Sequence, residues 1–182
     1  YFINSGPFTV HRIDKDTTGV LMFAKNRNYA QLLTSLFRLR KIKKTYLCIA
    51  LGQFEKTSGI LKDKLEYYEK DKKIYLTATT KFKVVDSSNF YSLLELNPIT
   101  GRKHQLRKQL LIHNHPIIGD SKYKIRNNNN SKKNILMLHA HKISFFINNK
   151  KYEFVAPIPK EFSNFAYQKN LKNFYSRFLK LI

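Results

Sequence analysis

The feature that most constrains this chain is a polar segment, residues 11–19 (HRIDKDTTG), that runs directly into five apolar residues at 20–24 (VLMFA). A short apolar run bounded by polar residues is typical of a buried β-strand. The pattern therefore predicts that Asp14 lies at the foot of a core strand, beside the cations Arg12 and Lys15. A carboxylate held there favours a role as nucleophile or base toward an anionic substrate.

The charge balance points to the same kind of partner. The 182 residues contain 34 Lys and Arg against 12 Asp and Glu, which gives a net charge of +22. A field of this strength attracts phosphate and makes binding depend on salt. We expect a nucleic acid as the partner; a basic face that binds a membrane surface or is merely solvated is the alternative.

Length and composition bound the class of protein. A chain of 182 residues with 42% hydrophobic residues is long enough for one domain with its own core. No apolar run reaches the roughly 18 residues that span a bilayer, so we expect a protein without membrane association. The lone Cys48 cannot form an intramolecular disulfide and is expected in the core of a cytoplasmic protein.

The hydrophobic pattern predicts an α+β fold with a mixed, mainly antiparallel sheet and flanking helices. Residues 29–41 have helical spacing. Strands are expected at 44–51, 74–77, 80–85 and 91–96, with a lysine-rich hairpin turn at 69–73 and a turn at 86–89 (DSSN). Short turns between successive strands favour antiparallel pairing.

The second half of the chain adds helices and one more hairpin. Residues 102–114 carry a helical stripe that places Arg107 in the first turns. Residues 120–133 are polar and predict a loop. A final hairpin is expected over 135–147 and 152–155. Residues 161–182 have apolar side chains near a 3.6 period and predict a terminal amphipathic helix.

Several motifs resemble those of one enzyme family. HRIDKDTTG closely resembles the HRLDxxTSG segment of the RluA-type pseudouridine synthases. Four further blocks are similar to that family's motifs and follow in the same order: residues 44–52 (KTYLCIALG), 101–107 (GRKHQLR), 115–123 (HPIIGDSKY), and 138–140 (LHA) together with 156–159 (APIP). Five ordered blocks make chance similarity a poor explanation.

The resemblance implies an activity and three catalytic residues. Members of this family break the C1′–N1 bond of a uridine in RNA and rejoin the ribose to C5. By resemblance Asp14 is the catalytic carboxylate, and attack on C1′, attack on uracil C6 and a glycal route all remain open for it. Arg107 is expected to keep Asp14 ionised. Tyr46 is expected to stack on uracil and assist proton transfer.

Substrate-binding residues follow from the same resemblance. Arg12 is expected to occupy the RNA stack where the target uridine leaves. Arg102 is expected to contact phosphate. His104 and Gln105 are expected to cap or brace the helix that carries Arg107, and His11 is expected to be structural.

The resemblance also bounds substrate and organisation. The motifs are closest to RluC- and RluD-like members, which act on large-subunit ribosomal RNA, so 23S ribosomal RNA is the expected substrate and transfer RNA the alternative. Residues 1–182 are expected to form one catalytic domain that lacks an upstream strand and an N-terminal S4 module. We expect a monomer that needs no cofactor and no metal.

Two other classes of function are compatible with parts of the sequence. Residues 113–115 (HNH) and 139–141 (HAH) place histidines at a spacing that a metal-dependent nuclease could use. Acidic ligands are sparse around them. A non-catalytic RNA-binding or ribosome-assembly module is the second alternative, and the joint presence of Asp14, Tyr46 and Arg107 argues against it.

Overall fold

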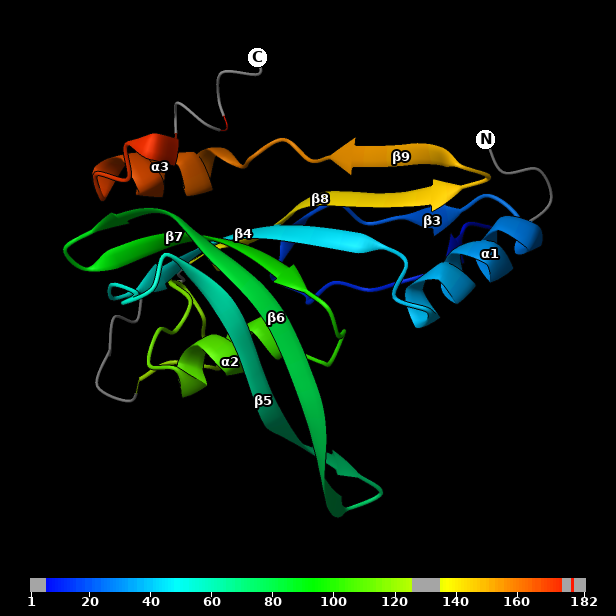
Figure 1. The fold of residues 1–182 in the computed structure, drawn as a ribbon, viewed down its shortest axis with the longest axis horizontal. Coiled ribbons are helices and arrows are strands. Elements are labelled where there is room, and N and C mark those ends of the chain that lie inside the picture. Colours follow the sequence, from blue (N-terminus) through cyan, green and yellow to red (C-terminus); the bar gives the residue numbers. More distant parts are fainter. Residues whose placement is uncertain (1–5, 126–134, 175–177, 179–182) are drawn as a thin grey trace.

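The computed structural model describes residues 6–125, 135–174 and 178. Within these residues the main sheet has seven strands in the order β2-β8-β4-β7-β6-β5, with β9 joined to β8. Only the pair of β2 and β8 is parallel, so the predicted α+β fold with a mainly antiparallel sheet is confirmed (Figure 1). The strands are β2 (Thr18–Gly19), β4 (Lys43–Leu51), β5 (Ser58–Glu69), β6 (Lys72–Ser88), β7 (Tyr91–Pro98), β8 (Leu138–Ile147) and β9 (Lys150–Val155).

The longest pairing in the sheet is a hairpin. Strand β5 pairs with β6 from Ser58 opposite Lys83 to Glu69 opposite Lys72, and its far end projects from the body of the molecule (Figure 1). The chain turns at residues 70–71, which confirms the lysine-rich turn. The sequence pattern divided β6 into two strands, which was wrong, because β6 runs unbroken to Ser88 with one irregularity in its pairing to β7. The turn expected at 86–89 does join β6 to β7, but it lies at residues 89–90.

The apolar run at residues 20–24 does not form the buried strand that its composition predicted. Only β3 (Phe23–Ala24) is a strand, and it pairs with β1 (Phe8–Thr9) in a small separate sheet. Leu21 is 41% exposed and Phe23 is 47% exposed. The chain pairs with β8 for only two residues and then leaves the main sheet, so there is no second sheet neighbour to bury the run.

Three helices flank the sheet. Helix α1 (Arg27–Arg38) is capped by Asn26, whose side chain accepts a hydrogen bond from the Tyr29 N–H. Helix α2 (Gln105–Ile112) and helix α3 (Lys160–Gln168) lie on opposite faces of the sheet (Figure 1). The described part of the chain contains no helix long and apolar enough to cross a membrane.

The prediction of one helix over residues 161–182 was wrong. Helix α3 ends at Gln168, and Asn170 has a left-handed backbone with φ of 57°. The N–H of Leu171 then donates to the carbonyl of Ala166, which closes the helix end as a left-handed cap does. Part of the predicted helix, residues 175–177 and 179–182, lies outside the described residues, as do residues 126–134 of the predicted loop.

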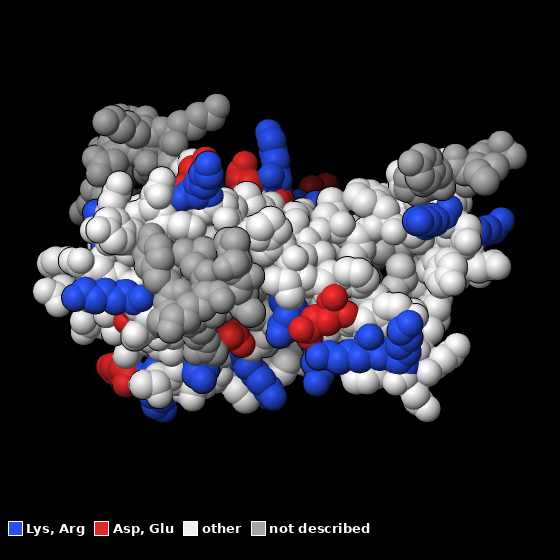
Figure 2. Space-filling view, turned by 90° about the horizontal axis from the view of Figure 1, so that it is seen from above, with Lys and Arg blue, Asp and Glu red and all other residues white. Residues whose placement is uncertain are grey.

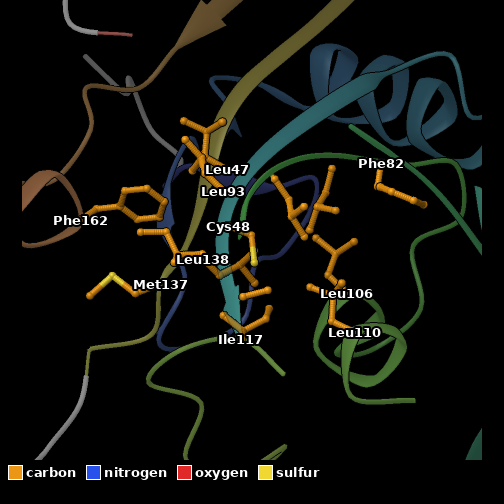
Figure 3. Close-up of a cluster of buried hydrophobic side chains, with 14 of the residues drawn as sticks. Leu47, Cys48, Phe82, Leu93, Leu106, Leu110, Ile117, Met137, Leu138 and Phe162 are labelled. Carbon is orange, nitrogen blue, oxygen red and sulfur yellow. The ribbon is translucent and has the colours of Figure 1, made fainter. Parts of the chain in front are cut away.

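The core has two parts. The larger cluster lies on both sides of β4: Leu106 and Leu110 of α2 pack on one side and Phe162 of α3 on the other (Figure 3). Cys48 lies within it, fully buried, and this burial raises the pKa of its thiol. The smaller cluster joins α1 to the ends of β8 and β9. Strand β4 is therefore held firmly in the core. Side chains of β4 and of the segments near α1 and α2 can contribute to one site.

Candidate active site

The loop that carries Asp14 is held by a short parallel pairing. Thr18 and Gly19 of β2 lie in register with His139 and Ala140 of β8. Gly19 has φ of +112°, and a Cβ there would lie 2.2 Å from the carbonyl oxygen of Ala140. A side chain at position 19 would therefore push β2 away from β8, which explains the glycine of the motif. The Thr18 hydroxyl also hydrogen bonds His139 Nδ1 at 2.9 Å.

This loop opens into a cleft with a volume of about 710 Å³. Three parts of the chain line it together with the loop. The end of α1 and the following segment contribute one group of residues, β4 contributes Tyr46, and the connection from β7 to α2 contributes another group. Four of the five predicted site residues line the cleft directly: Arg12, Asp14, Tyr46 and Arg102.

Helix α2 begins at Gln105, later than residue 102 where the sequence pattern started it. The Gln105 amide accepts hydrogen bonds from the Thr100 hydroxyl and the Arg102 N–H, and donates to Thr80. These bonds confirm that Gln105 braces the helix. They also fix the start of α2 against β6, so the direction of the first helical turn is set by buried contacts.

Arg107 stands in that first turn and is almost completely buried. Its Nε and Nη2 atoms donate to the two carboxylate oxygens of Asp120, each at 2.7 Å. Its remaining terminal nitrogen, Nη1, lies 3.6 Å from Asp14 Oδ2. The side chain of Asp14 is 20% exposed and that of Arg107 is 6% exposed. The guanidinium therefore sits behind Asp14, on the side away from solvent.

Asp120 is the buried anchor of this arrangement. Its side chain is fully buried and also accepts the backbone N–H groups of Lys122 and Tyr123 at 2.9 and 2.8 Å. Burial by itself would raise the pKa of Asp120, but the hydrogen bonds from Arg107 and from the two backbone groups lower it below its ordinary value. Asp120 therefore stays ionised and balances the charge of Arg107.

A second path leads from Asp120 to the other oxygen of Asp14. The Tyr123 hydroxyl hydrogen bonds His104 Nδ1 at 2.9 Å, and His104 Nε2 lies 3.9 Å from Asp14 Oδ1. His104 occupies the N-cap position of α2 with φ of 54°, where its carbonyl accepts the N–H of Lys108, but its side chain makes no capping hydrogen bond. Burial lowers its pKa, and the nearby Asp14 opposes that shift. We call Asp14, His104, Arg107, Asp120 and Tyr123 the Asp14 network.

Tyr46 comes from the middle of β4, where it is partly buried in the cleft lining. Burial, with a smaller contribution from the negative charge of Asp14, raises the pKa of Tyr46 to about 12. Its phenol therefore keeps its proton at neutral pH. Two residues earlier on the strand, Lys44 also lines the cleft, and burial lowers its pKa.

Arg12 and Arg102 lie at the outer part of the site. Arg12 is exposed. Arg102 is partly buried, and its Nε donates to the carbonyl of Thr77 at 3.4 Å, a long hydrogen bond. Both guanidinium groups remain available at the cleft, as a contact with an anionic ligand requires.

Three further histidines have ordinary neighbours. His11 Nε2 accepts the N–H of Met22 at 2.8 Å and its ring stacks on Phe37, so the structural role expected for it is confirmed. His113 lies 3.1 Å from Asp63, and His115 hydrogen bonds the carbonyl of Leu51. Among residues 6–125, 135–174 and 178, no group of three or more His, Cys, Asp or Glu is placed to hold a metal ion.

Sequence reasoning missed part of this site. Asp120 and Tyr123 belong to the HPIIGDSKY block, which was recognised without a role for either residue. An aspartate and a tyrosine three residues apart in a recognised motif were the available signal. Arg38, Arg40 and Lys44 also line the cleft. The sequence pattern assigned Arg38 and Arg40 only to a helix over residues 29–41, and Lys44 only to a strand.

The positive charge on the opposite side of the sheet is more dispersed. Figure 2 shows the face that carries α3, where most of the described Lys and Arg side chains are spread among uncharged residues and several Asp and Glu side chains. In the cleft, by contrast, six cationic residues line one cavity together with a single carboxylate, Asp14. These six are Arg12, Arg38, Arg40, Lys44, Arg102 and Lys103.

The mainly antiparallel sheet carries a cleft in which a carboxylate lies beside a buried arginine, and the cations of its lining favour a negatively charged ligand. Residues 2–111 match the family model described as RNA pseudouridylate synthase. The chain belongs to this family. It is also similar to a solved structure, Human RNA Pseudouridylate Synthase Domain Containing 4, with a TM-score of 0.81 and 26% identity over 91% of this chain and 77% of that one.

Two curated relatives illustrate the range of the family. The Ribosomal large subunit pseudouridine synthase D of Borreliella burgdorferi is 34% identical, and the match covers 93% of this chain and 52% of the relative. The tRNA pseudouridine synthase C of Haemophilus ducreyi is also 34% identical, with 79% of this chain and 68% of the relative covered. The chain thus spans about half the length of the first of these relatives.

Proposed function

We propose that this protein converts uridine to pseudouridine in RNA, with Asp14 as the catalytic carboxylate. The observation that carries the proposal is the placement of Asp14, which opens into the cationic cleft while the buried Arg107 lies 3.6 Å behind it. Membership of the RNA pseudouridylate synthase family supports the reaction, and the relatives' names support an RNA substrate.

The reaction rearranges bonds within one nucleotide. The C1′–N1 bond breaks and a C1′–C5 bond forms; C5 loses a proton and N1 gains one. No net oxidation or external energy is involved. The side chains present suit these steps: an ionised Asp14 can attack the nucleotide or stabilise positive charge on the ribose, and the protonated phenol of Tyr46 can donate a hydrogen bond.

The Arg107 guanidinium places a positive charge 3.6 Å from Asp14 Oδ2, on the buried side of the carboxylate. Because Asp120 already holds two nitrogens of Arg107, the third nitrogen is directed to Asp14 without rotational freedom. The aromatic ring of Tyr46 offers a stacking surface for uracil. Arg12 and Arg102 are placed for contacts with the RNA outside the target nucleotide.

Within this function we propose large-subunit ribosomal RNA as the substrate. The name of the Borreliella burgdorferi relative supports it, whereas the name of the Haemophilus ducreyi relative supports transfer RNA as the second candidate. Mapping pseudouridines in both RNA classes from cells with and without the gene decides between them. Loss of a site in the large-subunit RNA is the expected outcome.

We also propose that residues 1–182 form one catalytic domain that acts as a monomer in the cytoplasm. Strand β4 supports the single domain, because it contacts both β7 and β8 and packs between α2 and α3. Sedimentation equilibrium is expected to give a mass near 21.6 kDa. A mass of twice that value would contradict the monomer and leave the proposed reaction intact.

The Asp14→Asn substitution tests the catalytic proposal. The amide keeps the size of the side chain but loses its charge, so we expect RNA binding to persist while tritium release from 5-tritiated uridine in RNA falls on the order of 10⁴-fold. The matched control is Asp16→Asn, an exposed carboxylate in the same loop. Appreciable turnover by the Asp14→Asn protein would overturn the proposal.

A further inference from the structure

The segment that leads from α1 into β4 presents alternate residues to the cleft. Arg38, Arg40, Ile42, Lys44 and Tyr46 all belong to the cleft lining, whereas the residues between them do not. Within β4 the alternation follows from the extended chain, in which successive side chains point to opposite sides. Arg38 is the last residue of α1 and Arg40 has a left-handed backbone, so the end of the helix places these two side chains. Three of the five residues on the cleft side are cations. We call Arg38, Arg40 and Lys44 the α1 rim.

The charges of the α1 rim have no balancing carboxylate in the part of the chain that the structure describes. In the described ranges 6–125, 135–174 and 178, no Asp or Glu carboxylate lies within 4.0 Å of Arg38, Arg40 or Lys44. Lys44 is partly withdrawn from solvent, and this burial lowers its pKa. Burial of a cation without a counter-ion is unfavourable. A ligand that brings negative charge would remove that cost.

Arg40 adds a second argument. It follows the end of α1 and has a left-handed backbone with φ of 57°, while its N–H donates to the carbonyl of Phe37. Glycine is favoured at this position of a helix end. Here the chain carries an arginine instead, whose side chain lines the cleft.

We propose that the α1 rim is a phosphate-binding subsite that holds an RNA backbone phosphate next to the target nucleotide. The proposal rests on the proposed function, because it takes RNA as the ligand. Arg12 and Arg102 were assigned to the substrate already; the α1 rim adds cations to the lining of the same cleft, and Lys44 Nζ lies next to Gly101, the neighbour of Arg102. The α1 rim would then hold a phosphate beside the nucleotide that faces Asp14.

The experiment compares two double variants on the same segment. Arg40→Gln with Lys44→Met removes two charges from the cleft side, and Lys41→Gln with Lys43→Met removes two from the exposed residues that do not line the cleft. Dissociation constants for a uridine-containing RNA stem–loop are measured over a series of KCl concentrations. Circular dichroism and thermal unfolding check that both proteins are folded.

For the cleft-side variant we expect about tenfold weaker binding at physiological salt, with a slope of log affinity against log salt smaller by about 1.4, or roughly 0.7 for each lost contact with single-stranded RNA. In turnover measurements we expect the same variant mainly to raise KM. The control variant is expected to change the slope by less than half as much. Equal effects of the two variants would overturn the subsite and indicate only a general basic field.

A set of RNAs with one methylphosphonate each locates the phosphate. Replacing the contacted phosphate by this neutral group weakens binding to the native protein, and we expect no further weakening with the cleft-side variant. Additive effects at every position would overturn the subsite. These are binding measurements, so their failure is distinguishable from that of the proposed function: native protein that binds as expected but forms no pseudouridine would refute the function alone.

Discussion

The two groups of charged side chains that border the cleft differ in how their charges are balanced. In the Asp14 network, Arg107 is buried and shares two hydrogen bonds with Asp120. In the α1 rim, the described residues provide no carboxylate within 4.0 Å. Charges that are paired inside the protein have fixed directions, which suits chemistry on one nucleotide. Charges without an internal partner can be paired by a ligand, which suits binding.

The Asp120→Asn substitution breaks the first group and has the largest expected effect of the predictions that follow. Removing one partner of a buried ion pair costs about 3 kcal/mol of unfolding free energy. Arg107 would also lose its fixed direction, and a misplaced group can reduce turnover about a hundredfold. Urea unfolding and single-turnover tritium release, measured where the variant is fully folded, check both effects.

The matched control for that variant is Asp63→Asn. Asp63 is another carboxylate beside α2, where it accepts a hydrogen bond from Gln109 at 2.7 Å, but it does not line the cleft. We expect a loss of about 1 kcal/mol in stability and unchanged chemistry. If both variants lowered turnover equally once folded, the Asp14 network would have only a structural role.

The dependence of stability on pH tests the comparison further, because His11 lines the cleft and its ring stacks on Phe37 of α1. Burial, assisted by the positive charge of Lys44, lowers the pKa of His11 from 6.5 to about 4. The unfolded chain therefore binds a proton at higher pH than the folded protein. Stability from this group is fully present above pH 6.5 and is lost as the pH falls from 6.5 toward 4.

The expected loss from His11 is about 2 kcal/mol, below the roughly 3 kcal/mol of the full pKa difference because the ring is partly exposed. Protonation of Nε2 would also abolish its hydrogen bond from the Met22 N–H. Unfolding free energies at pH 7 and pH 4.5 measure the effect, and His11→Gln is expected to reduce the difference between them. An unchanged difference would assign the acid sensitivity to other groups.

Tyr46 lies in the cleft lining with residues of both groups. Its substitution can separate an effect on RNA binding from an effect on the chemical step. Tyr46→Phe keeps the ring and removes the hydroxyl, so we expect RNA affinity within about twofold and turnover lowered at least about tenfold. Because the pKa of Tyr46 is raised to about 12, its ionisation is not expected to appear in the pH–rate profile below pH 10. Full activity of Tyr46→Phe would leave the ring as the only functional part.

Local patterns predicted most of the secondary structure correctly. The helix near residues 29–41, the strand at 44–51, the hairpin turn at 69–73 and the final hairpin over 135–147 and 152–155 are found close to the expected positions. The errors occur where the secondary structure depends on contacts that the local sequence pattern does not show. Residues 20–24 lack a second strand to bury them, and the helix predicted over 161–182 is interrupted by the left-handed Asn170.

For the candidate site, the sequence by itself determined the chemical groups and the family. The HRIDKDTTG, KTYLCIALG and GRKHQLR blocks contain Asp14, Tyr46 and Arg107, because their spacing within each motif is local. Only the tertiary structure decided that Asp120 holds Arg107 and that Arg38, Arg40 and Lys44 line the same cleft. Which charges are paired depends on distances set by the packing of α1 and α2 against β4, and these distances are not encoded in any one segment.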